Sequence, residues 1–329
     1  MIFSENKNAK NEELKKYIPV SQSLPFDKVK PFIETAQRDY LVPLMGAGTV
    51  AQLEAYYAKP EDTDESKRST FEGLLIRCQR AVINIAFLLG FDALNAEIDG
   101  SGFGRLESEN RKILYKYQED NLRDWFKTTG FNSFDDVLQY LHTNIETFEA
   151  YAASDQYTRF KSQFFKTVQQ FDNIYPIGNS YLTFLRLLKH MQVIIDFDLQ
   201  KAIGAEMLLT IIEEISKAEL TEATKKLLPH IQKPLAYLST AKLMEDTGAD
   251  LTENGLYFTA WASGGQNQLE KQPATEQRVA SLVARNRETG NSYLRALCMY
   301  LDKSTDWEFT ITRGTVFNRD NTNKKTFWA

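Results

Sequence analysis

The chain has 329 residues, of which 43% are hydrophobic, 12% aromatic and 25% charged, a globular composition that excludes wholly disordered, collagenous and coiled-coil proteins. It carries 39 Lys and Arg against 44 Asp and Glu, and the net charge of −5 disfavours a protein that grips DNA or RNA. Its two cysteines, Cys78 and Cys298, lie far apart and have no metal-spaced neighbours, which excludes a disulfide scaffold and a zinc ribbon.

Neither a targeting nor a membrane-spanning segment is expected. Met1–Lys16 is polar and charged, without the apolar core of a secretory signal. The most apolar stretch, Ala81–Leu94, is too short to span a bilayer and indicates a buried helix. We therefore expect a protein that is made in a cytoplasm and has no membrane partner.

The apolar pattern is mostly helical. In Phe26–Tyr40 apolar residues recur every three to four positions, and this predicts a helix that ends near Pro43 and Gly46. Ser133 is expected to cap a short helix, and Lys59–Ser69 to form a polar loop. The predicted helices are Phe26–Tyr40, a helix from Thr49 through Tyr57, Phe71–Leu94, Glu107–Lys127, Phe134–Leu141 and Tyr181–Leu199. The alternating Trp307–Phe317 predicts a strand near the C-terminus.

The second half of the chain repeats the first at an offset of 153 to 160 residues. The matched pairs are Leu41–Leu53 with Leu199–Ile211, Leu74–Val82 with Leu227–Leu235, Gly102–Phe103 with Gly255–Leu256, Asn132–Phe134 with Asn291–Tyr293, and Tyr140–Leu141 with Tyr300–Leu301. A residue present in both copies is expected to be structural. Gly46, Gly204, Gly102 and Gly255 are accordingly predicted to be structural turns.

These patterns predict a mainly α fold with two tandem, duplicated helical-bundle units and a short β-like or extended C-terminal segment. The predicted divisions are an N-terminal arm at 1–25, helical unit 1 at 26–150, helical unit 2 at 151–304 and an extended tail at 305–329.

One stretch, Gly46–Ala51, has the glycine spacing of a dinucleotide-binding fingerprint. Pro43 lies where that fingerprint needs a strand. About 20 residues further on, where a second strand with a ribose-binding acid is required, the sequence has the polar loop. The second copy keeps only Gly204. A turn between two helices is therefore favoured over a cofactor site.

The other candidate chemical groups are also better explained as structural. Asp196 and Asp198 are two residues apart and point to different sides of a helix, so they are not expected to hold a cation together. His142, His190 and His230 are scattered, and Cys78 lies among apolar residues where a thiol is usually inert. We expect no catalytic residue, no metal and no cofactor, and hence no enzyme.

The last segment departs from the helical pattern and is rich in aromatic side chains. Burying two aromatic rings is worth several kcal/mol, which favours docking of the apolar Phe327–Trp328 over exposure to water. The predicted interface residues of this tail are Trp307, Phe309, Phe317, Phe327 and Trp328. We expect them to dock on a neighbouring chain; folding back on the chain's own domain is the alternative.

Five stretches of the sequence, taken in chain order, carry a resemblance to a known family. They are Pro31–Leu53, the long apolar helix after it, Asp99–Arg105, Glu109–Leu122 and Asn323–Trp328. The chain resembles a family of uncharacterised proteins from Bacteroidetes bacteria and their phages, and its order of elements is similar to the helical head–tail connector, or neck-ring, proteins of tailed phages. Such connectors are often about half this length, so the doubled unit departs from the family and leaves the ring's copy number open.

The resemblance implies a non-enzymatic structural protein in the neck of the virion, in a ring between portal and tail. Its implied partners are further copies of itself, the portal protein and other neck or tail proteins, with DNA passing nearby without specific binding. An acidic subunit suits such a passage because negative walls repel phosphate. Extended ends at 1–25 and 305–329 would suit exchange between subunits. A bacterial structural or adaptor protein is the alternative, ahead of a nucleotide- or metal-dependent enzyme.

Overall fold

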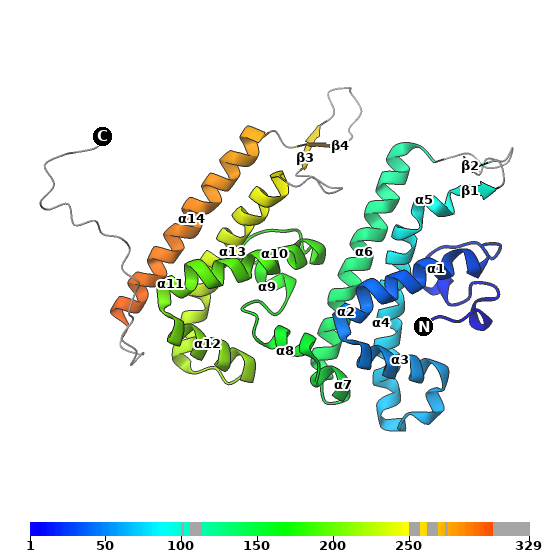
Figure 1. Ribbon diagram of the computed structural model, residues 1–329, viewed down its shortest axis with the longest axis horizontal. Helices are drawn as coiled ribbons and strands as arrows, with labels where there is room; N and C mark the ends of the chain where they lie inside the picture. The colour runs from blue at the N-terminus through cyan, green and yellow to red at the C-terminus, as the bar shows by residue number, and fades with distance from the viewer. Residues whose placement is uncertain (100–101, 106–113, 250–256, 262–268, 274–275, 305–329) are drawn as a thin grey trace, which may run out of the picture. The chain divides into compact units, whose positions relative to one another are not determined.

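Figure 1 shows the computed structural model, which describes residues 1–99, 102–105, 114–249, 257–261, 269–273 and 276–304. The described chain is mainly helical, with two short hairpins, and divides into two compact units. Unit 1 comprises Met1–Lys161, Lys166–Asp172 and Ile177–Phe184; unit 2 comprises Ser162–Phe165, Asn173–Pro176 and the chain from Leu185 onward. The prediction of a mainly α protein with two tandem units is confirmed, and the chain passes between the two units several times from Ser162 to Leu185.

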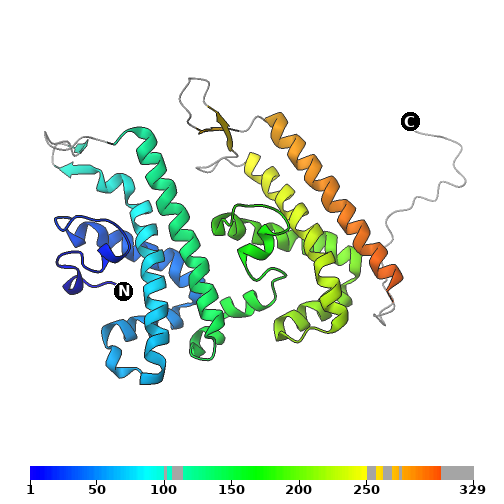
Figure 2. The same cartoon turned by 180° about the vertical axis from the view of Figure 1, so that it is seen from behind.

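Unit 1 is built around a pair of long antiparallel helices, α4 and α6, joined through a hairpin at one end (Figures 1 and 2). Asp64 caps α4 by accepting a hydrogen bond from the Ser66 amide, and Gly90 ends the helix. The helices are α1 Phe26–Ala36, α2 Val42–Met45, α3 Ala47–Ala58, α4 Glu65–Leu89, α5 Phe91–Leu94, α6 Lys116–Thr143, α7 Glu149–Ala152, α8 Asp155–Lys161 and α9 Val168–Asp172. The antiparallel hairpin consists of β1 Ala96–Asp99 and β2 Gly102–Arg105.

Unit 2 has the same order of elements, with a second long pair, α13 and α14, and a second hairpin. Its helices are α10 Tyr181–Ile194, α11 Gln200–Ile203, α12 Ala205–Lys217, α13 Glu222–Ala249 and α14 Glu276–Lys303; the first four residues of α10 count with unit 1. The antiparallel hairpin is β3 Tyr257–Trp261 with β4 Leu269–Pro273. The order helix, break, helix, long helix, hairpin, long helix therefore occurs twice.

The two units share an unusual backbone feature. A five-residue π-helical turn precedes the helix break in each, η3 at Gln37–Leu41 and η5 at Ile195–Leu199. A π-turn accommodates one extra residue in a helix, and Pro43 next to η3 lacks the amide that a regular turn would use. Lys201 replaces Pro43 in unit 2, yet the π-turn is present. The turn therefore belongs to the repeated scaffold and does not depend on proline.

The first 25 residues, predicted to be an arm, pack on unit 1. Ile2 and Phe3 are buried, and the side-chain amide of Gln79 on α4 donates a 2.7 Å hydrogen bond to the Ile2 carbonyl. In unit 2 the matching Gln232 donates a 2.7 Å bond to the carbonyl of Phe164, which is buried too. Because both copies anchor buried apolar residues in this way, the segment packs as part of the repeated unit and is not an extended arm.

Helix α6 is continuous where the sequence predicted a break at Ser133. The Ser133 hydroxyl donates a 2.7 Å bond to the Thr129 carbonyl of the preceding turn, and so does not cap a new helix. Because α6 and α14 are each uninterrupted over 28 residues, Gly130 corresponds to Gly290, in the same register that matches Tyr140 with Tyr300. The proposed match of Asn132 with Asn291 is therefore wrong by one residue.

Sequence patterns failed to predict either hairpin, because strands of four or five residues are too short to show an alternating pattern. The predicted strand at 307–317 and the tail at 305–329 lie outside the described residues. In the part of the chain that the structure describes, no helix combines the length and apolar character needed to cross a bilayer.

Candidate functional site: an apolar cavity in unit 1

The predicted turn glycines have different surroundings. Gly46 joins α2 to α3 at φ 83° and ψ 148°, and Gly204 joins α11 to α12 at φ 87° and ψ 152°. This backbone region is accessible essentially only to glycine, so both positions are true chain turns. Gly102 instead begins strand β2, while Gly255 lies outside the described residues. The predicted interface residues Trp307, Phe309, Phe317, Phe327 and Trp328 also lie outside them.

The glycine-rich stretch at Gly46–Ala51 does not have the geometry of a dinucleotide fingerprint. A helix, α2, precedes Gly46, whereas the fingerprint requires a strand at that place. A Cβ built on Gly46 would lie 3.1 Å from Oε1 of Gln156, so the turn is packed against another part of unit 1. The glycine serves packing and leaves no space for a pyrophosphate.

The two aspartates of unit 2 lie on the π-turn η5. Asp196 accepts a 2.8 Å hydrogen bond from Gln192, and partial burial raises the pKa of Asp198, opposed by the nearby charges of Lys201 and Arg287. Among the described residues no group of three or more His, Cys, Asp or Glu side chains is arranged to hold a metal ion. Asp196 therefore takes part in a local hydrogen bond, and Asp198 is half-buried with two cationic side chains in its surroundings.

The histidines occupy separate packed positions. His142 stacks on Phe160 with ring centroids 3.5 Å apart, and its Nε2 lies 2.9 Å from the Tyr151 hydroxyl. Burial lowers the pKa of His142 to about 4, so the ring is neutral near pH 7. His190 lies 3.4 Å from Asp246, and His230 stacks on Tyr300. The three rings are parts of three different local clusters.

Cys78 is also part of the core. Its sulfur lies 3.6 Å from that of Met45, and complete burial raises the pKa of the thiol. A thiol with a raised pKa is a poor nucleophile near neutral pH. The titratable residues singled out in the sequence thus do not come together into one chemical site.

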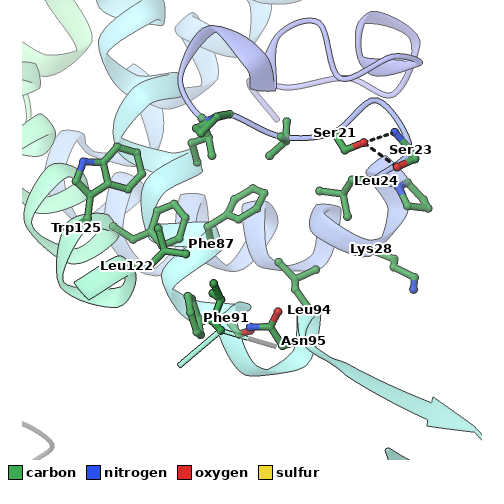
Figure 3. Close-up of a pocket in the computed structure, with 16 residues that line it drawn as sticks. Ser21, Ser23, Leu24, Lys28, Phe87, Phe91, Leu94, Asn95, Leu122 and Trp125 are labelled. Carbon is green, nitrogen blue, oxygen red and sulfur yellow. Dashed lines mark hydrogen bonds between the residues drawn. The ribbon is translucent and has the colours of Figure 1, made fainter. Parts of the chain in front are cut away.

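The structure instead contains an apolar cavity of about 480 Å³ in unit 1 (Figure 3). Three segments far apart in the sequence form it: the stretch before and into α1, the end of α4 with α5, and the start of α6. The lining residues are Ile18, Pro19, Val20, Ser21, Ser23, Leu24, Pro25, Lys28, Phe87, Phe91, Leu94, Asn95, Leu114, Leu122, Trp125 and Phe126. Its size falls in the range of about 300–1,000 Å³ typical of ligand pockets.

Aromatic rings make up one wall of this cavity. Phe126 lies against Phe87, with ring centroids 5.6 Å apart, and against Trp125 at 5.1 Å. Trp125 is 42% exposed although it is a large apolar residue on a helix. In Figure 3 Trp125 and Leu122 lie on one side of the cavity, and Leu24 and Lys28 lie on the other. The wall can therefore receive a further flat apolar group.

The charges around the cavity suit binding better than catalysis. Among the lining residues that the structure describes, Lys28 is the one charged residue, and none is an acid, a histidine or a cysteine. At its edge the guanidinium of Arg123 lies 4.2 Å from the centroid of the Phe91 ring and pairs with Asp92. Serine hydroxyls and the Asn95 amide are the other polar groups. The arrangement favours an aromatic or aliphatic group that lacks a formal charge.

Sequence reasoning did not find this cavity. Its residues are ordinary apolar positions in three separate segments, and only folding brings them together. One signal was present: Trp125 and Phe126 in the first copy correspond to Arg285 and Asn286 in the second. An aromatic pair in one copy alone indicates a role beyond the shared fold.

Comparison with known proteins identifies a family. Residues 41–161 and 199–315 each match a family of unknown function (DUF6712), so the duplication found in the sequence is confirmed. No curated protein matches the chain, and no solved structure does. Because the two matches together span more than half of the sequence, the chain belongs to this family of unknown function (DUF6712).

Proposed function

We propose that the protein is a non-enzymatic structural protein of the virion of a tailed phage or prophage. In this proposal it is a subunit of the head–tail connector, or neck ring, and it joins the portal to the tail. The resemblance of the sequence to connector proteins suggests the place, and the comparison of the two units supports a role in assembly.

The observation that carries the proposal is the apolar surface of unit 2. Phe197 on η5 is 72% exposed and Leu209 on α12 is 66% exposed. At the corresponding positions, unit 1 has Asp39 and Ala51, which are exposed as well. Since both units fold in the same way with either set of side chains, Phe197 and Leu209 are not needed for folding. Large exposed apolar side chains of this kind are typical of protein contacts.

Helix α14 adds a third position of the same type. Met299 is 58% exposed, and its counterpart in unit 1 is the exposed polar residue Gln139. Methionine adapts to varied apolar partners because its side chain is flexible and polarizable. At these three positions the residue is polar or small in unit 1 and apolar in unit 2, whereas at the exposed Trp125 the change runs the other way, to Arg285.

Contacts in a closed ring are heterologous, since each subunit presents one surface to one neighbour and a different surface to the other. A chain of two related but unequal units offers such surfaces: an aromatic cavity on unit 1 and exposed apolar residues on unit 2. The net charge of −5 suits a ring through which DNA passes without adhering.

The mass of the full chain tests this proposal. Native mass spectrometry of the protein, alone and mixed with portal and neck proteins encoded beside it, is expected to give a closed oligomer or a monomer that joins a ring on the portal. A monomer or simple dimer indifferent to every virion protein contradicts the proposal and favours an adaptor outside the virion.

Matched variants sharpen the test. Phe197→Asp and Leu209→Ala introduce the residues that unit 1 carries at these positions, so the fold is expected to remain and assembly to weaken. Gln139→Glu changes an exposed residue of unit 1 by one charge and serves as the control. If the Phe197→Asp, Leu209→Ala double variant assembled fully, the exposed apolar residues of unit 2 would no longer support the proposal.

A further inference from the structure

The counterpart of the cavity in unit 2 is occupied by an aromatic ring of the chain itself. At the repeat offset, Phe91 and Phe126 of unit 1 correspond to Met244 and Asn286. The side-chain nitrogen of Asn286 lies 3.6 Å from the sulfur of Met244 and donates a 3.0 Å hydrogen bond to the hydroxyl of Tyr175. The same place between the two long helices therefore accepts a tyrosine in the second copy.

Tyr175 reaches this place from the segment before α10, and it is held by further rings. Its ring meets that of Tyr237 edge to face, with centroids 5.3 Å apart, and Tyr237 in turn lies 5.6 Å from Tyr293. Edge-to-face ring pairs contribute stability beyond the burial of area. Unit 2 thus shows that an aromatic ring fits between the two long helices of the repeated unit, near Met244 and Asn286.

In unit 1 the ring at the corresponding position, Tyr17, is not among the described residues that line the cavity, and its hydroxyl donates a 2.8 Å hydrogen bond to Gln79 instead. Residues 18–25 line the cavity with Ile18, Pro19, Val20, Leu24, Pro25 and two serines, and none of these is aromatic. The lining helices are also less polar in unit 1. Asn286, which donates a hydrogen bond to the Tyr175 hydroxyl, has the apolar Phe126 as its counterpart in unit 1. The cavity of unit 1 is therefore adapted to an aromatic group without a hydroxyl.

Aromatic groups without a hydroxyl also occur in the sequence after the second family match. That match ends at residue 315, and the sequence beyond it contains Phe327 and Trp328. Residues 305–329 give enough chain to leave one subunit, since an extended chain spans about 3.3 Å per residue. These residues lie outside the described part of the structure.

We propose that the cavity of unit 1 is the receptor for Phe327–Trp328 of a second copy of the chain. The contact joins two different surfaces, a cavity on one subunit and a C-terminal segment on the next, which is the heterologous type that closes into rings. This inference rests on the proposed ring function and gives that ring its subunit contact. Trp125, Phe126 and Phe87 form the wall on which the incoming ring packs.

Complementation between two full-length variants tests the contact. Trp125→Glu places a charge on the cavity wall, and the double change Phe327→Ser, Trp328→Ser removes the incoming rings. Each variant alone is expected to be monomeric in native mass spectrometry. A 1:1 mixture is expected to give a heterodimer, because one chain keeps the segment and the other keeps the cavity. Tyr117→Glu, on the same helix and 55% exposed but outside the cavity, is expected to assemble like the wild type.

A second readout separates this inference from the ring itself. A labelled peptide of residues 316–329 is titrated by fluorescence anisotropy onto the chain that carries Phe327→Ser and Trp328→Ser. Adding Trp125→Glu is expected to weaken peptide binding at least tenfold, and Leu114→Glu, at an exposed lining position, gives a second test if Trp125→Glu loses its helical circular dichroism.

The outcomes are distinct. A wild-type ring whose assembly survives the cavity and tail variants, with no peptide binding, overturns this inference and leaves the connector proposal standing. Peptide binding to the cavity in a wild-type protein that stays monomeric at every concentration, both alone and with the portal protein, also overturns it, because the segment then does not join two copies of the chain. Assembly lost in both variants and regained on mixing establishes the contact.

Discussion

Gly130 on α6 faces Ile85 on α4 so closely that a Cβ on the glycine would lie 2.7 Å from Cδ1 of the isoleucine. The same relationship occurs in unit 2, where a Cβ on Gly290 would lie 2.7 Å from Cδ2 of Leu238. Ile85 and Leu238 correspond at the repeat offset. The close approach of the two long helices is therefore a property of the repeated unit, and glycine is kept at the contact because it has no side chain.

Replacing either contact glycine by alanine is expected to destabilise its unit. The added methyl group overpacks the helix pair, at a cost of about 1–3 kcal/mol of unfolding free energy, which exceeds the gain in helix propensity. Urea denaturation of Gly130→Ala and Gly290→Ala measures this. Gly48→Ala is the control, since its Cβ would meet Ala150 at an ordinary 3.6 Å. Equal stability of all three variants would contradict the close-packed arrangement.

Alanine at Gly46 or Gly204 is expected to lower the unfolding free energy by about 1–3 kcal/mol, because the backbone conformation at both turns is strained for any residue with a side chain. Gly46→Ala is expected to cost more, since its Cβ meets Gln156, while nothing lies within 4 Å of that position at Gly204. Chemical denaturation gives both values. An unaltered Gly204→Ala protein would mean that the turn has a different conformation.

Gln79→Leu is expected to free the N-terminal segment from unit 1. The variant loses the bond to the Ile2 carbonyl and the 2.8 Å bond that Gln79 accepts from the Tyr17 hydroxyl. A buried polar group left without its partner costs about 1–3 kcal/mol. Hydrogen exchange near Phe3 is expected to accelerate. The control is Gln139→Leu, at an exposed position of α6, which is expected to leave the exchange rate near Phe3 unchanged. Slow exchange near Phe3 in both variants would contradict the anchoring role of Gln79.

Acid is expected to destabilise the protein through His142. Its pKa is about 4 in the folded chain and about 6.5 when unfolded, so between these values only the unfolded state gains the proton. The stability that depends on His142 is therefore complete above pH 6.5 and falls as the pH drops to 4, by about 2 kcal/mol after allowance for partial exposure.

Urea denaturation of the wild type and of His142→Phe at pH 7.5 and pH 4.5 measures the contribution of His142 to the loss of stability in acid. The variant cannot bind the proton, and its phenyl ring retains the stacking on Phe160. Its stability is expected to decrease less than that of the wild type between the two pH values. Equal decreases would show that His142 does not contribute to the acid sensitivity.

The sequence alone determined the helical class, the duplication and the two glycine turns. These features are local: a helical period repeats within a few residues, and the match of Leu41–Leu53 with Leu199–Ile211 is visible without any contact. The family match at 41–161 and 199–315 has the same offset at its start. A glycine before a helix start likewise needs no tertiary partner to be recognised.

Only the tertiary structure decided where distant segments meet. The N-terminal segment became part of unit 1 through Gln79, far along the chain, and α6 stayed continuous across Ser133 because it packs along α4. The cavity arises where three separate segments meet, and each of them alone resembles ordinary core. Burial energy depends on which apolar surfaces come together, and this is settled by folding and not by the period of any one segment.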